Sequence, residues 1–397
     1  MNTFDFDTVI DRRNTNSMKF DFAKENGLPE DVLPLWVADM DFKAPDCVRS
    51  ALDAAVQHGI FGYSAPMDGY YDAVIAWFRE NFNWEPEKDW FIKTPGVVTA
   101  VHMAIHALTE PGDRVMIQTP VYYPFYRCIQ GNGRTLVENP LIYKDGHYEI
   151  DFEDFERKIV EQQVKMFILC SPHNPVCRVW TQDELQHMGS ICHQHGVFVV
   201  SDEIHCDFAF PEYPHTIFLQ ANPYMQEECM ILTAPSKSFN LAGLQVSNNF
   251  LPNAEKRALI KAEMGRCGCV HLNAMGIIAC QAAYEGGLPW LNECRAYLRA
   301  NLDYLRAFLR DHLPEIRLVE PEGTYFAWLD CSGLGLSRDE LNDLIVNRAR
   351  LWLDAGHIFG EAAEQFQRIV LACPRETLEK ALYQLEGAVA ELREERI

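Results

Sequence analysis

The sequence lacks the features of an exported or membrane-bound protein. Residues 1–7 (MNTFDFD) form neither a basic nor an apolar leader segment. No uninterrupted apolar run approaches the ~18 residues that are needed to span a bilayer. We therefore expect a cytoplasmic protein that has no membrane partner.

Basic residues are also scarce. The 397 residues include 57 Asp and Glu against 35 Lys and Arg, which gives a formal net charge of −22 at pH 7. Such a negative field repels phosphate backbones at long range. We therefore expect no nucleic-acid partner.

The thirteen cysteines do not form a metal-binding pattern. There is no Cys-x-x-Cys pair, and the Cys267-Gly-Cys269 pair has no second ligand pair nearby. His102 and His106 have helical spacing but lack the glutamate of a metalloprotease helix. We expect no metal site, and in a reducing compartment we expect free thiols that are buried as small hydrophobic side chains.

What the sequence does contain is typical of an α/β protein. Hydrophobic residues make up 48% of the chain and charged residues 23%, as in an ordinary globular protein. Between residues 95 and 250, short apolar runs alternate with helix-like segments, which predicts a mainly parallel sheet covered by helices. A helix over 182–195, after a Thr181 cap, joins two strands in a right-handed βαβ unit. The predicted strands span residues 114–118, 166–170, 197–201 and 230–233.

The length predicts two domains, because a single hydrophobic core stops growing at roughly 250–300 residues. Residues 285–289 (EGGLP) interrupt a helical pattern and mark the boundary. Long helices are expected after it, over residues 290–313 and 375–396. We predict a large domain over residues 45–287 and a smaller, discontinuous α+β domain over residues 1–44 and 288–397.

Polar residues follow the predicted strands at the points where the strands end. Tyr122, Asn174, Asp202 and Lys237 lie after the first, second, third and fourth strand. Because ligands bind beyond the carboxyl ends of the strands in an open α/β sheet, we expect these four side chains to meet. Taken singly, each has an ordinary structural explanation, such as a helix cap, a turn or a surface amine. Their occurrence at successive strand ends favours a shared site.

This set of side chains fits pyridoxal 5'-phosphate (PLP). Lys237 can form a Schiff base with the aldehyde and then remove the α-proton of the substrate. Asp202 can keep the ring nitrogen protonated, Asn174 can donate to the phenolic oxygen, and Tyr122 can stack on the ring. The start of a helix that runs to Leu108 offers free backbone amides to the phosphate.

Longer sequence motifs also indicate a PLP enzyme. They cover residues 11–17, 33–42, 59–63, 94–98, 171–176, 201–205 and 233–243. Together they make the sequence similar to fold type I PLP enzymes of the class I/II aminotransferase superfamily, and within them to the MalY/PatB branch of cystathionine β-lyase-like proteins. The resemblance covers nearly the whole chain. It implies that Lys237, Asp202, Asn174 and Tyr122 have the roles given above.

The resemblance assigns further residues. It implies that the Val97 and Val98 amides and Ser236 hold the phosphate. It also implies a homodimer with shared active sites, in which Tyr63 reaches the phosphate of the neighbouring subunit. Arg368 resembles the arginine that binds the substrate carboxylate, a task suited to a planar guanidinium.

Gln245 and His205 depart from the aminotransferase pattern, and Cys177 departs from the pattern of the MalY/PatB branch. Gln245 stands eight residues after Lys237, where many relatives have a phosphate-binding arginine, so the charge must come from elsewhere. His205 stands where many aminotransferases have a tyrosine, which fits the lyase-like branch, and we place it among the cofactor-binding residues. Cys177 occupies a turn position that is expected to be glycine, where a left-handed backbone would be strained.

The resemblance implies α,β-elimination from a sulfur-containing amino acid such as cystathionine, which gives a thiol, pyruvate and ammonia. An aminotransferase would share the removal of the α-proton and then return the proton to the cofactor. A binding or regulatory protein without catalysis is a third alternative, which the presence of Lys237 and Asp202 disfavours. The sequence leaves the physiological substrate open.

Overall fold

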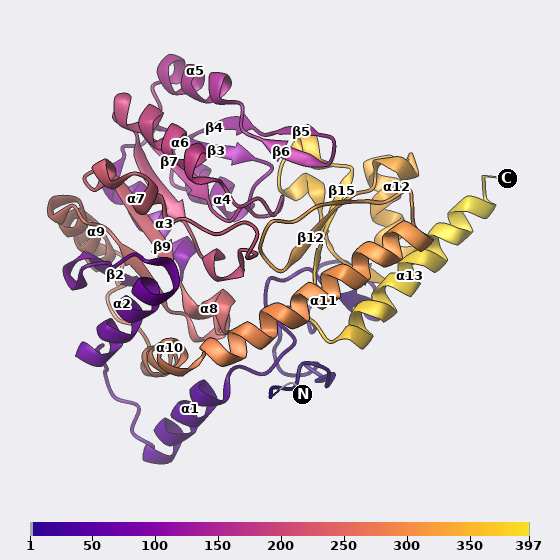
Figure 1. The fold of residues 1–397 in the computed structure, drawn as a ribbon, viewed down its shortest axis with the longest axis horizontal. Coiled ribbons are helices and arrows are strands. Elements are labelled where there is room, and N and C mark those ends of the chain that lie inside the picture. The colour runs from indigo at the N-terminus through magenta and orange to yellow at the C-terminus, as the bar shows by residue number, and fades with distance from the viewer. Residues whose placement is uncertain (1–2, 397) are drawn as a thin grey trace.

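The computed structural model describes residues 3–396 and has a seven-stranded sheet as its centre (Figure 1). The strand order is β2-β10-β9-β8-β7-β3-β4. All neighbouring pairs are parallel except those of β10, which runs antiparallel to β9 and β2. The strands are β2 (Phe91–Thr94), β3 (Arg114–Thr119), β4 (Thr135–Pro140), β7 (Met166–Cys170), β8 (Phe198–Asp202), β9 (Cys229–Thr233) and β10 (Ser247–Phe250).

The central strands are buried at every residue because both faces of the sheet are covered. Met166 and Ile168 of β7 belong to one hydrophobic cluster, and Phe167 and Leu169 belong to another. The first cluster includes α3 (Val97–Leu108), α4 (Pro124–Gln130) and α9 (Ala254–Arg266). The second includes α2 (Asp68–Phe82), α5 (Phe152–Gln162), α6 (Gln182–Gln194), α7 (Phe218–Ala221) and α10 (Ala274–Gly286).

The predicted α/β class is confirmed, and so are the four predicted strands, within one or two residues at each end. Val197 precedes β8 rather than opening it. The predicted helix after Thr181 is α6, and its first turn has a capping box, in which the Thr181 side chain and Glu184 satisfy each other's backbone amides.

Elements of residues 33–34 and 288–394 form a second layer beside the first (Figure 1). Its sheet has the order β11-β12-β15-β14, with antiparallel neighbours. A separate hydrophobic cluster of Leu35 and residues from 302 to 392 fills it. Its elements are β1 (Leu33–Pro34), α11 (Leu288–His312), β11 (Arg317–Val319), β12 (Phe326–Asp330), α12 (Arg338–Asp343), β13 (Leu351–Trp352), β14 (Asp354–Ala355), β15 (Phe366–Val370) and α13 (Arg375–Glu394).

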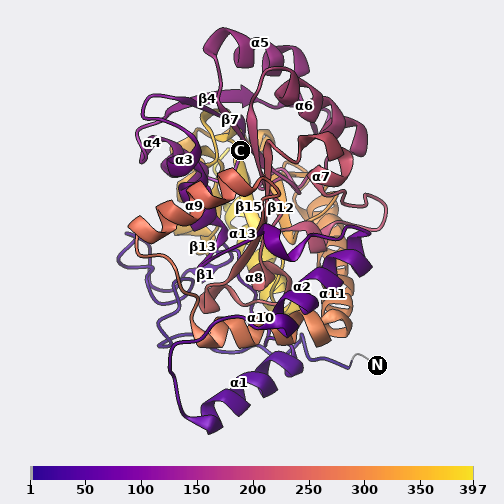
Figure 2. The same ribbon diagram turned by 90° about the vertical axis from the view of Figure 1, so that its left-hand side faces the viewer.

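The predicted domain boundary falls at a junction between two helices. α10 ends at Gly286, and α11 begins at Leu288. The division into residues 45–287 on one side and 1–44 with 288–397 on the other stays a proposal. α1 (Asp46–His58) packs against α10 and lies at the periphery in both views (Figures 1 and 2).

All thirteen cysteines are free thiols, and ten of them are buried. Within residues 3–396, no group of three or more His, Cys, Asp or Glu side chains is placed to hold a metal ion. Over the same residues, no helix is both long enough and apolar enough to cross a membrane.

Candidate active site

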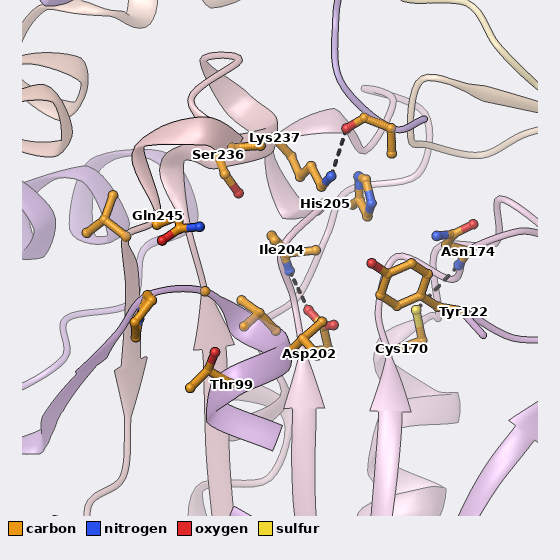
Figure 3. Close-up of a pocket in the computed structure, with 17 residues that line it drawn as sticks. Thr99, Tyr122, Cys170, Asn174, Asp202, Ile204, His205, Ser236, Lys237 and Gln245 are labelled. Atoms are coloured by element: carbon orange, nitrogen blue, oxygen red, sulfur yellow. Dashed lines mark hydrogen bonds between the residues drawn. The ribbon is translucent and has the colours of Figure 1, made fainter. Parts of the chain in front are cut away.

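A cavity of about 190 Å³ lies beyond the carboxyl ends of the central strands (Figure 3). All but two of the ten predicted site residues line it. They are Val97, Val98, Tyr122, Asn174, Asp202, His205, Ser236 and Lys237. In Figure 3 the side chains of Lys237, Asp202 and Tyr122 project from separate segments into one space. The expectation that strand ends bring these groups together therefore holds.

Lys237 lies on the short helix α8 (Pro235–Ser238), directly after β9. Its Nζ donates a hydrogen bond of 2.7 Å to the carbonyl oxygen of Ala38. Burial lowers the pKa of Lys237 to about 8, although the negative charges of Asp39 and Asp202 favour its protonated form. A substantial fraction of this amine is therefore neutral near pH 8, as a nucleophile or a base requires.

Asp202 ends β8 and is only 4% exposed. Its carboxylate accepts one backbone hydrogen bond, from the amide of Ile204 at 3.2 Å. Burial raises the pKa of Asp202 to about 7, while that amide and the charge of Lys237 oppose the rise. A buried carboxyl with so few partners is a strong acceptor for a cationic group placed beside it.

Neutral side chains form another part of the wall. Asn174 is 3% exposed, and its Oδ1 accepts a hydrogen bond of 2.7 Å from Arg368. Burial raises the pKa of the Tyr122 hydroxyl. Burial, with the positive charges of Lys237 and Arg368, lowers the pKa of His205 well below its ordinary value, so the imidazole is neutral at pH 7. The buried Nδ1 of His205 has no hydrogen-bond partner within residues 3–396.

The start of α3 faces the cavity on the side of the sheet edge formed by β2. Gly96, Val97 and Val98 line the cavity there, at the end of the helix where backbone amides have no intrahelical acceptor. Ser236 and Gln245 line the cavity as well. Lys237 is the one cationic side chain among the described residues that line it. An anion at this end would therefore be held by amides and hydroxyls rather than by an arginine.

Two predicted residues do not line the cavity. Arg368, on β15, is 2% exposed and lies behind Asn174, where it also donates to the carbonyl oxygen of Trp36 at 2.8 Å and pairs with Asp354. Tyr63 lies between α1 and α2 and is fully exposed, at 103% of its reference area. It contributes nothing to the cavity of its own chain.

Several groups at the site were not predicted. Ala38 supplies its carbonyl oxygen to Lys237, 199 residues away in the sequence, and no side-chain signal marks such a contact. Cys170 and Ile204 line the cavity because they adjoin the strand ends. Both residues could have been predicted to line the site, because they lie close to Asn174 and Asp202 in the sequence.

The turn after Asn174 has the conformation that the sequence predicted. Cys177 has a φ of 60°, in the left-handed region that favours glycine. Its side chain is buried, and its Sγ receives a hydrogen bond of 3.3 Å from the Thr324 hydroxyl. Packing of this thiol offsets part of the backbone strain.

The sequence matches the family model for aminotransferase class I and II over residues 30–385. It is 42% identical to cystathionine beta-lyase PatB of Bacillus subtilis over 385 residues, which cover 97% of this chain and 100% of PatB. It is 33% identical to protein MalY of Escherichia coli over 392 residues, which cover 98% of this chain and 100% of MalY. These relatives confirm the resemblance to the MalY/PatB branch.

Solved structures share the whole fold. A PLP-bound putative aminotransferase from Clostridium difficile has a TM-score of 0.95 at 38% identity, covering 97% of this chain and 100% of that chain. Cystalysin from Treponema denticola, whose structure contains PLP, also has a TM-score of 0.95, at 35% identity and over 98% and 99% of the two chains. The chain therefore belongs to the aminotransferase class I and II family.

Proposed function

We propose that this protein is a PLP-dependent carbon-sulfur β-lyase, which converts a cysteine thioether and water to a thiol, pyruvate and ammonia. The observation that carries the proposal is the meeting of Lys237, Asp202, Asn174 and Tyr122 in one buried cavity. The 42% identity to a cystathionine β-lyase over nearly the full length supports the choice of bond.

The cavity fits PLP in its chemistry. Asp202 offers a buried carboxylate that holds a single hydrogen bond, and His205 offers a ring nitrogen without a partner. Gly96, Val97 and the rest of the first turn of α3 offer amides to a phosphate. When bound, PLP supplies an aldehyde that condenses with amines and a pyridinium ring that withdraws electrons from the substrate α-carbon.

Lys237 carries two tasks in this proposal. Its amine holds the cofactor at rest, because its low pKa leaves a neutral nitrogen available for condensation. Once a substrate amine has taken its place on the cofactor, the same Nζ would be free to accept the proton from the α-carbon. The Ala38 carbonyl oxygen that now accepts from Nζ can hold the amine in position for this transfer.

Asp202, Asn174 and Tyr122 orient the cofactor and tune its charge. With PLP bound, an ionised Asp202 would hold the ring nitrogen in its protonated form, and the low local polarity would strengthen this pair. The amide of Asn174 would donate to the phenolic oxygen, and the Tyr122 ring would stack on the cofactor. Ser236 and the Gln245 amide, which line the same cavity, would hold the phosphate together with the start of α3.

Arg368 is our proposed carboxylate clamp. Its guanidinium already contacts Asn174, Trp36 and Asp354, so a substrate carboxylate would replace one of these acceptors. The Nε of Arg368 is buried without a partner within residues 3–396, which leaves one donor free for the incoming oxygen.

We also propose a homodimer in which Tyr63 contacts the phosphate in the partner's site. The segment between α1 and α2 exposes several large apolar side chains, which isolated surface positions do not explain. Their exposed fractions are 74% for Ile60, 65% for Phe61, 103% for Tyr63 and 81% for Met67. A second copy that covers this segment would remove them from water.

An aminotransferase is the second candidate, which the similarity to the putative aminotransferase from Clostridium difficile favours. The two reactions are separated by incubating the PLP-loaded protein with L-cystathionine and no keto acid. A lyase releases thiol and pyruvate in equal amounts over many turnovers. An aminotransferase stops after one turnover and resumes only when a keto acid is added.

The position of the cofactor is tested without turnover. Borohydride reduction followed by peptide mapping should place the label on Lys237, and Lys237→Ala should abolish it. Lys256→Ala, at an amine bonded to the carbonyl oxygen of Glu227 on the surface, is the matched control and should leave the label in place. A label on any other lysine contradicts the site.

A further inference from the structure

A second hollow of about 490 Å³ shares no lining residue with the cofactor cavity, but Tyr123 in its wall lies next to Tyr122 in the wall of that cavity, with ring centroids 5.5 Å apart. We call it the outer hollow. It lies between α4, the start of the chain and the strands β13 and β14. The residues that matter in it are Trp36, Tyr123, Tyr126, Arg127, Trp352 and Asp354.

Arg368 lies on the boundary between the two spaces. Its Nη1 donates to Asn174, which lines the cofactor cavity. Its Nη2 donates to the carbonyl oxygen of Trp36 and pairs with Asp354, and both of these residues line the outer hollow. An amino acid whose carboxylate binds Arg368 therefore has the outer hollow within reach of its side chain.

The walls of the outer hollow are aromatic. The rings of Trp36 and Trp352 stack with centroids 4.3 Å apart and an interplanar angle of 13°. The Tyr126 hydroxyl donates to the carbonyl oxygen of Phe359 at 2.9 Å, which fixes its ring. Such faces suit the methylene chain of a thioether, because they remove apolar surface from water.

Arg127 supplies an uncommitted charge to the outer hollow. It is exposed on α4 and makes no ion pair or side-chain hydrogen bond with any of residues 3–396. Its guanidinium is therefore free to pair with an anion that enters the outer hollow. The carboxylate of Asp354, also in the outer hollow, is already paired with Arg368. The unpaired charged side chain in the outer hollow is therefore the cationic Arg127.

We propose that the outer hollow binds the leaving-thiol portion of the substrate and that Arg127 pairs with a carboxylate at its distal end. This inference rests on the proposed lyase function and makes it more specific. The preferred substrates are cysteine thioethers whose thiol portion ends in a carboxylate. The planar guanidinium can form two parallel hydrogen bonds to such a group.

Two substrates of nearly equal size test the proposal on the PLP-loaded enzyme. S-(2-carboxyethyl)-L-cysteine carries the distal carboxylate, and S-propyl-L-cysteine carries a methyl group instead. Arg127→Gln should lower kcat/KM for the carboxylate by roughly 10-fold, mainly through KM, and change the propyl substrate less than about twofold. Arg127→Lys should restore part of the loss, because it returns the charge without the planar fork.

Arg114→Gln is the matched control. Arg114 is also exposed and has no ion pair within residues 3–396. It is the first residue of β3 and therefore lies at the amino end of the strand, whereas the cofactor cavity lies beyond the carboxyl ends. It should affect neither substrate. A loss shared equally by both substrates in Arg127→Gln, or no loss for the carboxylate, would overturn the assignment of Arg127.

A binding measurement separates this inference from the lyase proposal. In Lys237→Ala, where the base is absent, calorimetry gives dissociation constants for both amino acids without turnover. Adding Arg127→Gln should weaken the carboxylate ligand by roughly 10-fold and spare the propyl ligand. If the wild-type enzyme releases no thiol from either compound, the lyase proposal fails, while the calorimetric difference still decides whether Arg127 binds the distal carboxylate.

Discussion

Replacing Asp202 with asparagine should stabilise the cofactor-free protein at pH 8 while weakening its binding of PLP. Burial raises the pKa of Asp202 from 3.8 to about 7. At about 1.36 kcal/mol per pKa unit, ionising this carboxyl in the folded chain costs about 4 kcal/mol relative to the unfolded chain. Asparagine has the same size, keeps an oxygen for the Ile204 amide and carries no charge.

The effect has a definite dependence on pH. Because the folded protein holds this proton more tightly than the unfolded chain, the cost is absent below about pH 4, grows as the pH rises and is complete above about pH 7. Asp202→Asn removes it. The increase in the free energy of unfolding should therefore approach about 4 kcal/mol at pH 8 and fall below about 2 kcal/mol at pH 5. Loss of the favourable interaction between Asp202 and the charged Lys237 reduces this increase.

Thermal unfolding of the cofactor-free protein, followed by circular dichroism at both pH values, measures this difference. An unfolding entropy of about 2.1 cal/mol/K per residue converts 4 kcal/mol to a rise in Tm of roughly 5 °C for this chain length. Asp339→Asn, at a side chain that is 91% exposed, is the control and should leave Tm nearly unchanged.

Binding of PLP should change in the opposite direction. Loss of the charge-assisted contact to the ring nitrogen removes about 1.5–3 kcal/mol, so the dissociation constant should rise roughly 10- to 100-fold. The reasoning is refuted if Asp202→Asn destabilises the cofactor-free protein at pH 8, or if its gain is the same at pH 5 and pH 8.

Three other predictions concern the amine, the phosphate and the turn that carries Asn174. In the cofactor-free protein, acetylation of Lys237 should rise with a midpoint near pH 8, the value to which burial lowers its pKa, as followed by mass spectrometry of competitively labelled protein. Gln245→Arg should lower the dissociation constant of PLP roughly 10-fold in a fluorescence titration, because it adds a charge-assisted bond to the phosphate. Arg178→Met should lower Tm by roughly 4–6 °C, because it leaves the buried carboxylate of Glu322 without its cation, at a cost of about 3–5 kcal/mol.

Each of these has its own contradicting result. Labelling of Lys237 that begins only near pH 10, as for an exposed lysine, would show that burial does not control its pKa. A dissociation constant for PLP that is unchanged by Gln245→Arg would place the phosphate elsewhere. Arg157→Met removes an exposed ion pair, with the arginine 54% exposed, and should cost under about 1 kcal/mol, so equal losses in the two arginine variants would contradict the role of burial.

The central strands could be predicted because buried strands consist almost entirely of apolar residues. β7 and β8 are covered on both faces and therefore read as continuous apolar runs. β10 could not be predicted, since its sequence is Ser-Asn-Asn-Phe. Asn248 accepts a hydrogen bond from the Tyr70 hydroxyl, and Asn249 donates to the carbonyl oxygen of Ile92. These polar side chains are buried because distant groups satisfy them, which no local pattern reveals.

The same distinction applies to the site. The sequence could predict that four side chains meet, because parallel strands all end on the same side of a sheet. These are Tyr122, Asn174, Asp202 and Lys237. The contact of Lys237 with the Ala38 carbonyl oxygen depends on how the start of the chain folds back across that edge. A backbone acceptor has no residue type to recognise, so only the structure reveals it.

The groups proposed to bind PLP and the arginine proposed to bind the substrate carboxylate come from different parts of the fold. The groups proposed to bind PLP stand at strand ends of the large sheet or at the start of α3. The groups proposed to bind the substrate include Arg368 on β15, its partner Asp354 on β14 and Trp352 on β13, while Arg127 lies on α4 beside the large sheet. Asn174 joins the two sets directly through its hydrogen bond to Arg368. Substitutions in the outer hollow can therefore change which thiol leaves while the proton transfer at Lys237 stays intact.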